Sequence, residues 1–232
     1  MEKHTSKAYE QDLEKLREKI LRMGGLCEDA IERAMEALTE RNAALARATI
    51  ERDHLINRLE VEIDEQCIEL LALRQPAGSD LRLIITGLKI STDLERIGDL
   101  SVNLCERVLE LLQSVPLKPL IDIPHMAKLS IAMVHDSLDA YVRRDTQLAE
   151  SVCARDDEVD DLNDQIFREL LTYMMENPAN ISRALALSMV ARYLERIADH
   201  ANNISQMVIY LVKGKDIRHT TATAEQGAAG EG

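Results

Sequence analysis

The sequence contains very few aromatic residues and few residues that break helices. Among 232 residues there is no Trp, one Phe and five Tyr, so the chain has few rings on which single-stranded bases could stack. It has five prolines and nine glycines, and four of those glycines lie after position 213. Turn-rich β-sandwiches and barrels need more of both, so these absences favour an all-α protein.

Cysteine and basic residues are also scarce. The four cysteines are 40, 38 and 48 positions apart, a spacing without the C-x-x-C pair of zinc and thioredoxin-like sites. Lys and Arg number 28 against 41 Asp and Glu, and a net charge of −13 argues against binding nucleic acid or an anionic membrane surface. No run of about 18 apolar residues and no apolar leader occurs. We therefore predict a cytoplasmic protein with free thiols and no direct membrane insertion.

Breakers divide the chain into helical segments. Loops are expected at 76–79 and 177–180, and three prolines within nine residues mark a longer linker from position 116. After Lys213 the sequence becomes polar and of low complexity, which is typical of disorder. We predict two three-helix bundles at 1–115 and 125–213, a Pro-rich linker at 116–124 and a flexible tail at 214–232.

An internal repeat relates the two halves. Apolar positions from Ile90 to Leu111 alternate steps of four and three, and the same stripe returns 100 residues later from Val190 to Leu211. Upstream of the loops the offset is 103, which pairs Asp53 with Asp156. Each half is predicted to contain a helix, a tight turn near 41–42 or 144–145, a long helix, a Pro loop and another long helix.

Acidic residues recur at helical spacing in both halves. In the third helices the pattern is E-x3-D-x3-N, and in the second helices two acids stand four residues apart. This spacing places the side chains on one helical face beside the core stripe, where clustered carboxylates suit a hard divalent cation. The candidate metal ligands are Glu60, Asp64, Glu95, Asp99, Asn103, Asp160, Asp164, Glu195, Asp199 and Asn203.

A salt-bridge interpretation competes with the metal. Acid pairs four residues apart are frequent in this acidic chain, and Arg96, Arg192 and Arg196 lie close enough in sequence to bridge these ones. Recurrence in both halves keeps the metal as a candidate, although the residues alone favour the salt bridges. A catalytic di-iron site is not expected, because the Glu51-x-x-His54 spacing has no counterpart in the second half. No nucleophile or nucleotide-binding motif is present, so we predict that the protein is not an enzyme.

Several strings of the sequence resemble the PhoU-type phosphate transport system regulators of bacteria. They are Met23-Gly24-Gly25-Leu26, Arg74-Gln75-Pro76, Ser79-Asp80-Leu81-Arg82, the two Leu-Glu-Arg-Ile-x-Asp motifs, Leu171-Thr172-Tyr173-Met174-Met175, and Lys213-Gly214 with Arg218-His219. The resemblance spans roughly residues 8–219, although Ala198 stands where the first motif has Gly98.

The resemblance implies a fold, partners and a cofactor. The fold is two three-helix bundles side by side, and the function is repression of the phosphate-starvation response. The implied partners are the ATP-binding subunit of the phosphate ABC importer and the sensor histidine kinase of the regulon, and we expect a homodimer. The implied cofactor is a divalent metal such as Fe, Mg, Mn or Zn at the E-x3-D motifs. A carboxylate-bridged metalloprotein, for metal storage or catalysis, is the alternative, and a generic helical scaffold is a third.

Overall fold

Long α-helices follow the periodic segments of the sequence. The computed structural model describes residues 2–214, with side chains from Lys7 onward, and the predicted tail beyond Gly214 lies outside them. Within this range the helices are α1 (Glu2–Thr39), α2 (Ala43–Arg52), α3 (His54–Arg74), α4 (Gly78–Leu111), α5 (Asp122–Arg143), α6 (Thr146–Glu176), the short 3-10 helix η1 (Pro178–Asn180) and α7 (Ile181–Lys213).

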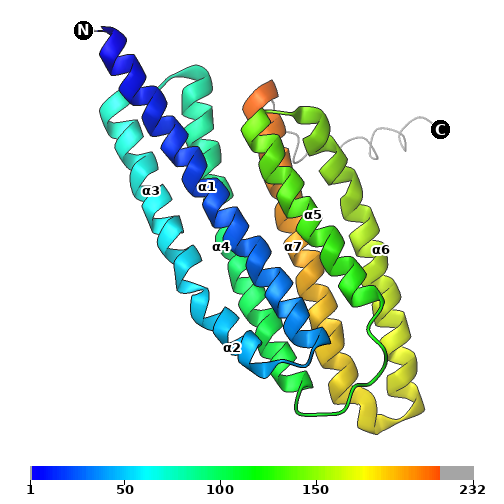
Figure 1. Ribbon diagram of the computed structural model, residues 1–232. Coiled ribbons are helices and arrows are strands. Elements are labelled where there is room, and N and C mark those ends of the chain that lie inside the picture. Colours follow the sequence, from blue (N-terminus) through cyan, green and yellow to red (C-terminus); the bar gives the residue numbers. More distant parts are fainter. Residues whose placement is uncertain (1, 215–232) are drawn as a thin grey trace, which may run out of the picture.

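The helices form two three-helix bundles that lie side by side (Figure 1). In the first bundle α1 and α4 pack with α2 and α3, which together make the middle member, and in the second α5, α6 and α7 pack together. Helices α4 and α7 form the main contact between the bundles, and α1 packs on α5 in front of them (Figure 1). The predicted all-α fold of two tandem bundles is confirmed.

The two predicted tight turns are present and equivalent. Arg41 and Arg144 adopt the left-handed backbone region, with φ of 56° and 54°. The next residue caps the following helix in each case: Asn42 accepts a hydrogen bond from the Leu45 amide, and Asp145 accepts from the Leu148 amide. The internal repeat therefore includes the backbone conformation and the helix cap of the two turns.

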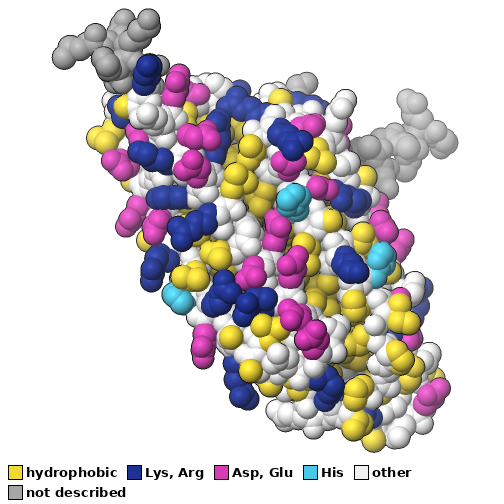
Figure 2. Space-filling model, in the orientation of Figure 1, with side chains coloured by type: hydrophobic (Ala, Val, Ile, Leu, Met, Phe, Trp, Pro, Cys, Tyr) yellow, Lys and Arg dark blue, Asp and Glu magenta, His cyan; other side chains and the backbone are white. Residues whose placement is uncertain are grey.

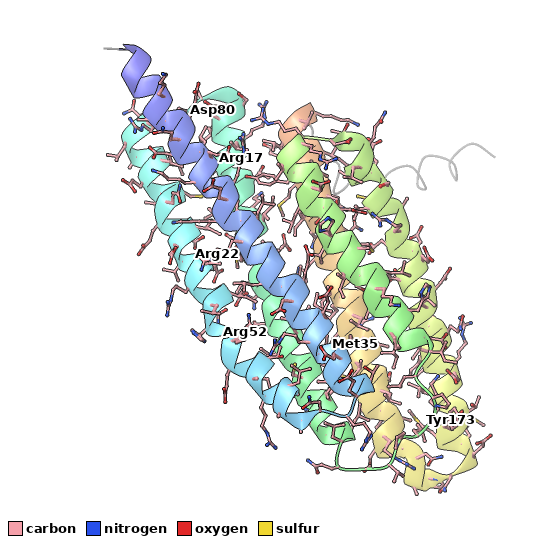
Figure 3. All side chains as sticks on the ribbon, viewed as in Figure 1. Arg17, Arg22, Met35, Arg52, Asp80 and Tyr173 are labelled. Carbon is pink, nitrogen blue, oxygen red and sulfur yellow. The ribbon has the colours of Figure 1, made fainter. Side chains whose placement is uncertain are left out.

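The middle helix of the first bundle is broken, which the sequence analysis did not predict. The Asp53 amide bonds to the Ile50 carbonyl three residues back, which tightens the turn, and the His54 ring nitrogen Nδ1 lies 2.7 Å from the Glu51 carbonyl oxygen. Arg52, which is labelled in Figure 3, pairs with Asp29 of α1 at 3.2 Å and connects α2 to that helix. The equivalent α6 is uninterrupted.

The linker lies between Leu111 and Asp122, so residues 122–124 of the predicted linker form the first turn of α5. Arg41 holds the linker to the first tight turn, because its Nη2 donates to the carbonyls of Leu112 and Ser114 at 3.1 and 2.7 Å. That each half is an independent folding unit stays a prediction.

Small and apolar residues form the seam between α1 and α5. A Cβ on Gly24 would lie 2.1 Å from Leu138 Cδ1, so this glycine allows the close approach of the two helices. Beside it runs a groove of about 560 Å³ lined by side chains such as Met35, Ile131 and His135. Figure 2 shows hydrophobic side chains along this face with acidic and histidine side chains around them.

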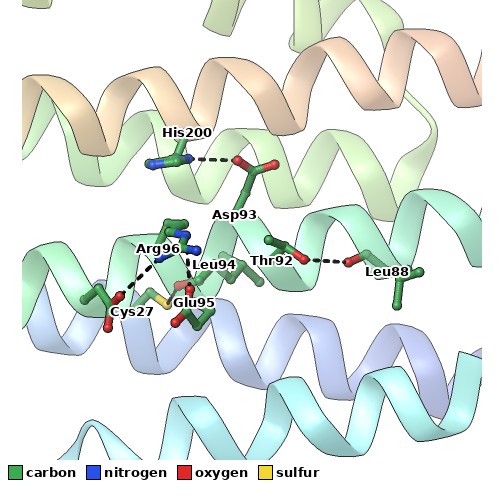
Figure 4. A network of polar contacts seen from close by, with 9 residues as sticks. Cys27, Leu88, Thr92, Asp93, Leu94, Glu95, Arg96 and His200 are labelled. Carbon is green, nitrogen blue, oxygen red and sulfur yellow. Dashed lines mark hydrogen bonds and ion pairs between the residues drawn. The ribbon is translucent and has the colours of Figure 1, made fainter.

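A buried polar contact joins α4 to α7 at the centre of the molecule. The His200 ring nitrogen Nδ1 lies 2.8 Å from Asp93 Oδ1, and the Asp93 side chain is buried (Figure 4). Among residues 2–214, no helix combines the length and the apolar character that a membrane crossing requires.

Candidate functional site

Carboxylates from α3 and α4 meet in the first bundle. Glu60 is half-buried, and burial together with the charges of Glu95, Asp64 and Asp99 raises its pKa. The pKa of Glu95 is raised for the same reasons, with Asp99 as the largest charge contribution. The predicted acids of the two helices are therefore neighbours in the folded chain. We define the first acid cluster as Asp53, Glu60, Asp64, Glu95 and Asp99.

Asp53 belongs to this cluster although the sequence analysis did not select it as a ligand. Its Oδ2 accepts a hydrogen bond from Asn57 at 2.8 Å, whereas its Oδ1 is buried without a hydrogen-bond partner. Burial, and then the charge of Asp99, raises the pKa of Asp53. Gly98 leaves room for it, because a Cβ there would lie 3.2 Å from Asp53 Oδ1.

An equivalent cluster lies between α6 and α7. Glu195 is buried, with Oε1 accepting a hydrogen bond from Arg192 at 2.9 Å and Oε2 lacking any partner. Burial, and then the charge of Asp199, raises the pKa of Glu195 and also that of Asp160. We define the second acid cluster as Asp156, Asp160, Asp164, Glu195 and Asp199.

Asp156 is the most perturbed acid of the second cluster. Burial and the charges of Asp199 and Asp160 raise its pKa to about 6, against an opposing hydrogen bond donated by Asn202. Asp156 also lay outside the predicted ligands. Its signal was present in the sequence, because Asp156, Asp160 and Asp164 are four residues apart and the repeat pairs Asp156 with Asp53.

Arginine side chains bridge both clusters in this structure. Arg96 lies with Nε 3.5 Å from Glu95 and Nη1 3.6 Å from Asp99 (Figure 4), and Arg192 pairs with Glu195 in the second cluster. Both guanidinium groups are more than half exposed, so these ion pairs stabilise the fold only slightly. In this structure acids of both clusters are therefore paired with arginine side chains, as the salt-bridge interpretation predicts.

The donor atoms of the clusters fit a hard divalent cation. Carboxylate oxygens are its preferred ligands, and Asp53 Oδ1 and Glu195 Oε2 are buried without a hydrogen-bond partner. Asn103 and Asn203 are half-buried one turn beyond Asp99 and Asp199. Within residues 2–214, no three His, Cys, Asp or Glu side chains are grouped closely enough to hold an ion without moving. The metal site stays a prediction.

The matches to known proteins cover both bundles. The PhoU domain model matches residues 20–108 and again 123–208, one copy for each repeat. The chain belongs to the PhoU family. A Pseudomonas putida relative named phosphate-specific transport system accessory protein PhoU homolog is 45% identical over 93% of this chain and 85% of its own. The Escherichia coli K12 accessory protein PhoU is 37% identical over 94% of this chain and 91% of its own.

Solved structures agree with the fold. The crystal structure of PhoU from Pseudomonas aeruginosa superimposes with a TM-score of 0.86 at 43% identity, covering 89% of this chain and all of that one. The PhoU regulatory protein from Streptococcus pneumoniae gives a TM-score of 0.83 at 28% identity, covering 90% of this chain and 99% of its own. The resemblance read from the sequence is confirmed, and the two PhoU repeats coincide with the two bundles.

Proposed function

We propose that this protein is a cytoplasmic adaptor that represses the phosphate-starvation regulon and limits phosphate uptake. It would couple the ATP-binding subunit of the phosphate ABC importer to the sensor histidine kinase of the regulon. The observation that carries this proposal is the match, over more than nine-tenths of the chain, to proteins named as accessory proteins of the phosphate-specific transport system.

The charge distribution supports an adaptor over a direct phosphate sensor. Both acid clusters bring together carboxylates of two neighbouring helices, and the chain carries a net charge of −13. Such a field repels phosphate, whose binding sites in proteins use helix N-termini or arginine side chains. Information about phosphate would therefore reach this protein through the importer, by way of contacts with its long helical faces.

Deletion of the gene tests the proposal. We expect alkaline phosphatase expression and phosphate uptake to become constitutive in phosphate-rich medium, and a second deletion that removes the kinase to restore low phosphatase. Re-expression of the chain is the control for polar effects. Phosphatase that stays repressed in the single deletion, or tight phosphate binding by the purified protein in calorimetry, would contradict the adaptor function.

We propose, as a second property, that the acid clusters bind divalent metal ions such as Fe, Mg, Mn or Zn. The support is the pair of buried, unpartnered oxygens, Asp53 Oδ1 and Glu195 Oε2, among carboxylates whose pKa values are raised by burial and then by one another's charges. A cation would neutralise that repulsion and hold the middle helix of each bundle to the third. The proposed role of the metal is structural.

Elemental analysis tests the metal. The variant E95A/D99A/E195A/D199A should lose bound metal after expression in supplemented medium and keep its helical circular dichroism. The control is E32A/E36A, which removes an exposed acid pair at the same spacing on α1. Equal metal content in the wild type and the quadruple variant would show that the acid clusters bind no metal and that their carboxylates pair with arginine side chains.

Sedimentation of the same samples tests the expected homodimer.

A further inference from the structure

A pocket lies beside the linker, where α4 ends and α7 begins (Figure 1). Its volume is about 290 Å³, and α1, α4, α7 and the linker all contribute to its wall, so both bundles meet there. Small molecules bind preferentially in pockets of this kind at the junction of two structural units, and the volume suits a small molecule better than a helix of a partner protein. We define the linker pocket by its apolar wall, which consists of Leu38, Leu111, Val115, Leu117, Leu120 and Leu187.

The apolar wall of the linker pocket is aliphatic. Leu38, Leu111 and Leu187 are at most 8% exposed, whereas Val115 of the linker is 72% exposed and lies towards solvent. None of the described residues that line the pocket is aromatic, so the pocket offers no ring on which a base or another planar group could stack. An aliphatic chain is therefore the apolar group that fits this wall.

The charged side chains that the structure places in the pocket wall are all basic, although the whole chain has a net charge of −13. They are Arg41, Lys118 and Arg183. Lys118 is buried and pairs with Glu169, which compensates its charge. Within residues 7–214 the side-chain partners of Arg41 and Arg183 are carbonyl and amide oxygens, not carboxylates. Two positive charges therefore remain to attract an anion.

Both arginines also keep N–H groups for a ligand. Arg41 uses only its Nη2, which donates to two carbonyls of the linker. Arg183 donates from Nη1 to the Val115 carbonyl at 3.1 Å and from Nη2 to the Asn180 side chain at 2.6 Å. A guanidinium has more N–H donors than these contacts use, and its planar geometry matches a carboxylate.

We propose that the linker pocket binds a small carboxylate anion with an aliphatic chain, such as a medium-chain fatty acid. The carboxylate accepts hydrogen bonds from Arg41 and Arg183, and the chain packs against the leucine side chains. Because Arg41 belongs to the first bundle and Arg183 to the second, the bound anion connects the two bundles beside the linker. Inorganic phosphate has no apolar part for this wall. The site goes beyond the proposed adaptor function and does not rest on it.

Isothermal titration calorimetry of the full chain with octanoate tests the site. Octanol and inorganic phosphate are the comparison ligands, since the first has the chain without the charge and the second has charge without the chain. The variant R41Q/R183Q removes both positive charges, while glutamine can still donate to the linker carbonyls. Its matched control is R58Q/R144Q, which removes two exposed arginines that do not line the pocket.

A second variant keeps both arginines and therefore their contacts with the linker. V115D introduces a carboxylate at an exposed position of the pocket wall, where it repels an anionic ligand. Its control is V212D, which introduces the same charge at an exposed valine near the end of α7. Thermal melting by circular dichroism checks that each variant is folded, and melting with added octanoate measures the stabilisation that binding gives.

We expect one octanoate to bind per chain, at least tenfold tighter than octanol, and phosphate to show no saturable binding. R41Q/R183Q and V115D should each bind octanoate at least tenfold more weakly than the wild type, whereas R58Q/R144Q and V212D should stay within twofold of it. Octanoate should raise the melting temperature of the wild type and of the two controls only. Equal affinities for octanoate and octanol, equal affinities of V115D and V212D, or no binding by the wild type would overturn the proposal.

Two further outcomes would identify a different occupant and also overturn the proposal. Sedimentation of the wild type with phosphatidylglycerol vesicles, if V115D abolishes it, would make the pocket a contact with a lipid surface and not a site for a free anion. A wild-type dimer that V115D converts to monomer would make the pocket a contact between copies of this chain. The phosphatase level of the deletion strain tests the proposed function separately, because it does not depend on octanoate binding.

Discussion

Gly24 and Gly25 are adjacent residues of α1 with different surroundings. A Cβ at Gly24 would overlap Leu138, whereas a Cβ at Gly25 would meet no atom within 4 Å. We expect G25A to stabilise the protein by about 0.5–1 kcal/mol, because alanine favours the helix. G24A should be less stable than G25A by about 1–3 kcal/mol, since Leu138 must move within a packed core. Urea denaturation followed by circular dichroism measures both, and equal stabilities would contradict the close packing.

Asp156 should make stability fall as the pH rises. Its pKa is raised from 3.8 to about 6 in the folded chain, so the folded state holds the proton more tightly than the unfolded state. The free energy of unfolding contributed by this group is therefore fully present below about pH 4 and is lost as the pH rises to about 6.

The D156N variant isolates this contribution. Asparagine keeps an acceptor for the Asn202 amide but carries no charge, so the difference in stability between D156N and wild type should grow in favour of D156N from pH 4 to pH 7. Urea titrations with a chelator present measure the difference without metal. If the free energies of unfolding of the two proteins change with pH in the same way, Asp156 has the same pKa in the folded and unfolded chains and the prediction is wrong.

At the scale of elements, Arg41 connects a tight turn to the linker. Its two hydrogen bonds to the carbonyls of Leu112 and Ser114 follow the end of α4, where backbone acceptors lack helical partners. We expect R41A to destabilise the protein by about 1 kcal/mol. R144A is the control, because Arg144 has the same backbone conformation at the equivalent turn. A loss as large in R144A would assign the effect to the turn and not to the linker.

At the scale of the whole molecule, Asp93 and His200 connect the bundles. H200A leaves a buried carboxylate without its partner, and we expect a loss of about 1–3 kcal/mol. The double variant D93A/H200A should lose less than the two single variants together, which a double-mutant cycle measures. Additive effects of the D93A and H200A variants would rule out coupling between Asp93 and His200.

His135 also pairs across the seam, with Glu28, but its side chain is exposed, so H135A should change stability by less than about 1 kcal/mol.

The sequence by itself determined the repeat, the helical face on which each acid lies and the helices, except for the break between α2 and α3. The scarcity of breakers predicted the all-α class, and the polar pairs at 41–42 and 144–145 predicted the two turns, because these signals are local to the chain. The spacing of Glu95 and Asp99 placed them beside the core stripe, where the structure also has them. Periodicity describes a side chain only relative to its own helix axis.

Only the tertiary structure decided which side chains meet across helices. The rotation and register of α3 against α4, and of α6 against α7, brought Asp53 and Asp156 into the acid clusters and left two carboxylate oxygens without partners. The same packing left Phe167, Leu171 and Met175 of α6 exposed, although their spacing of four residues also occurs in a core stripe. Distances between helices depend on the close packing of the core, which no single segment encodes.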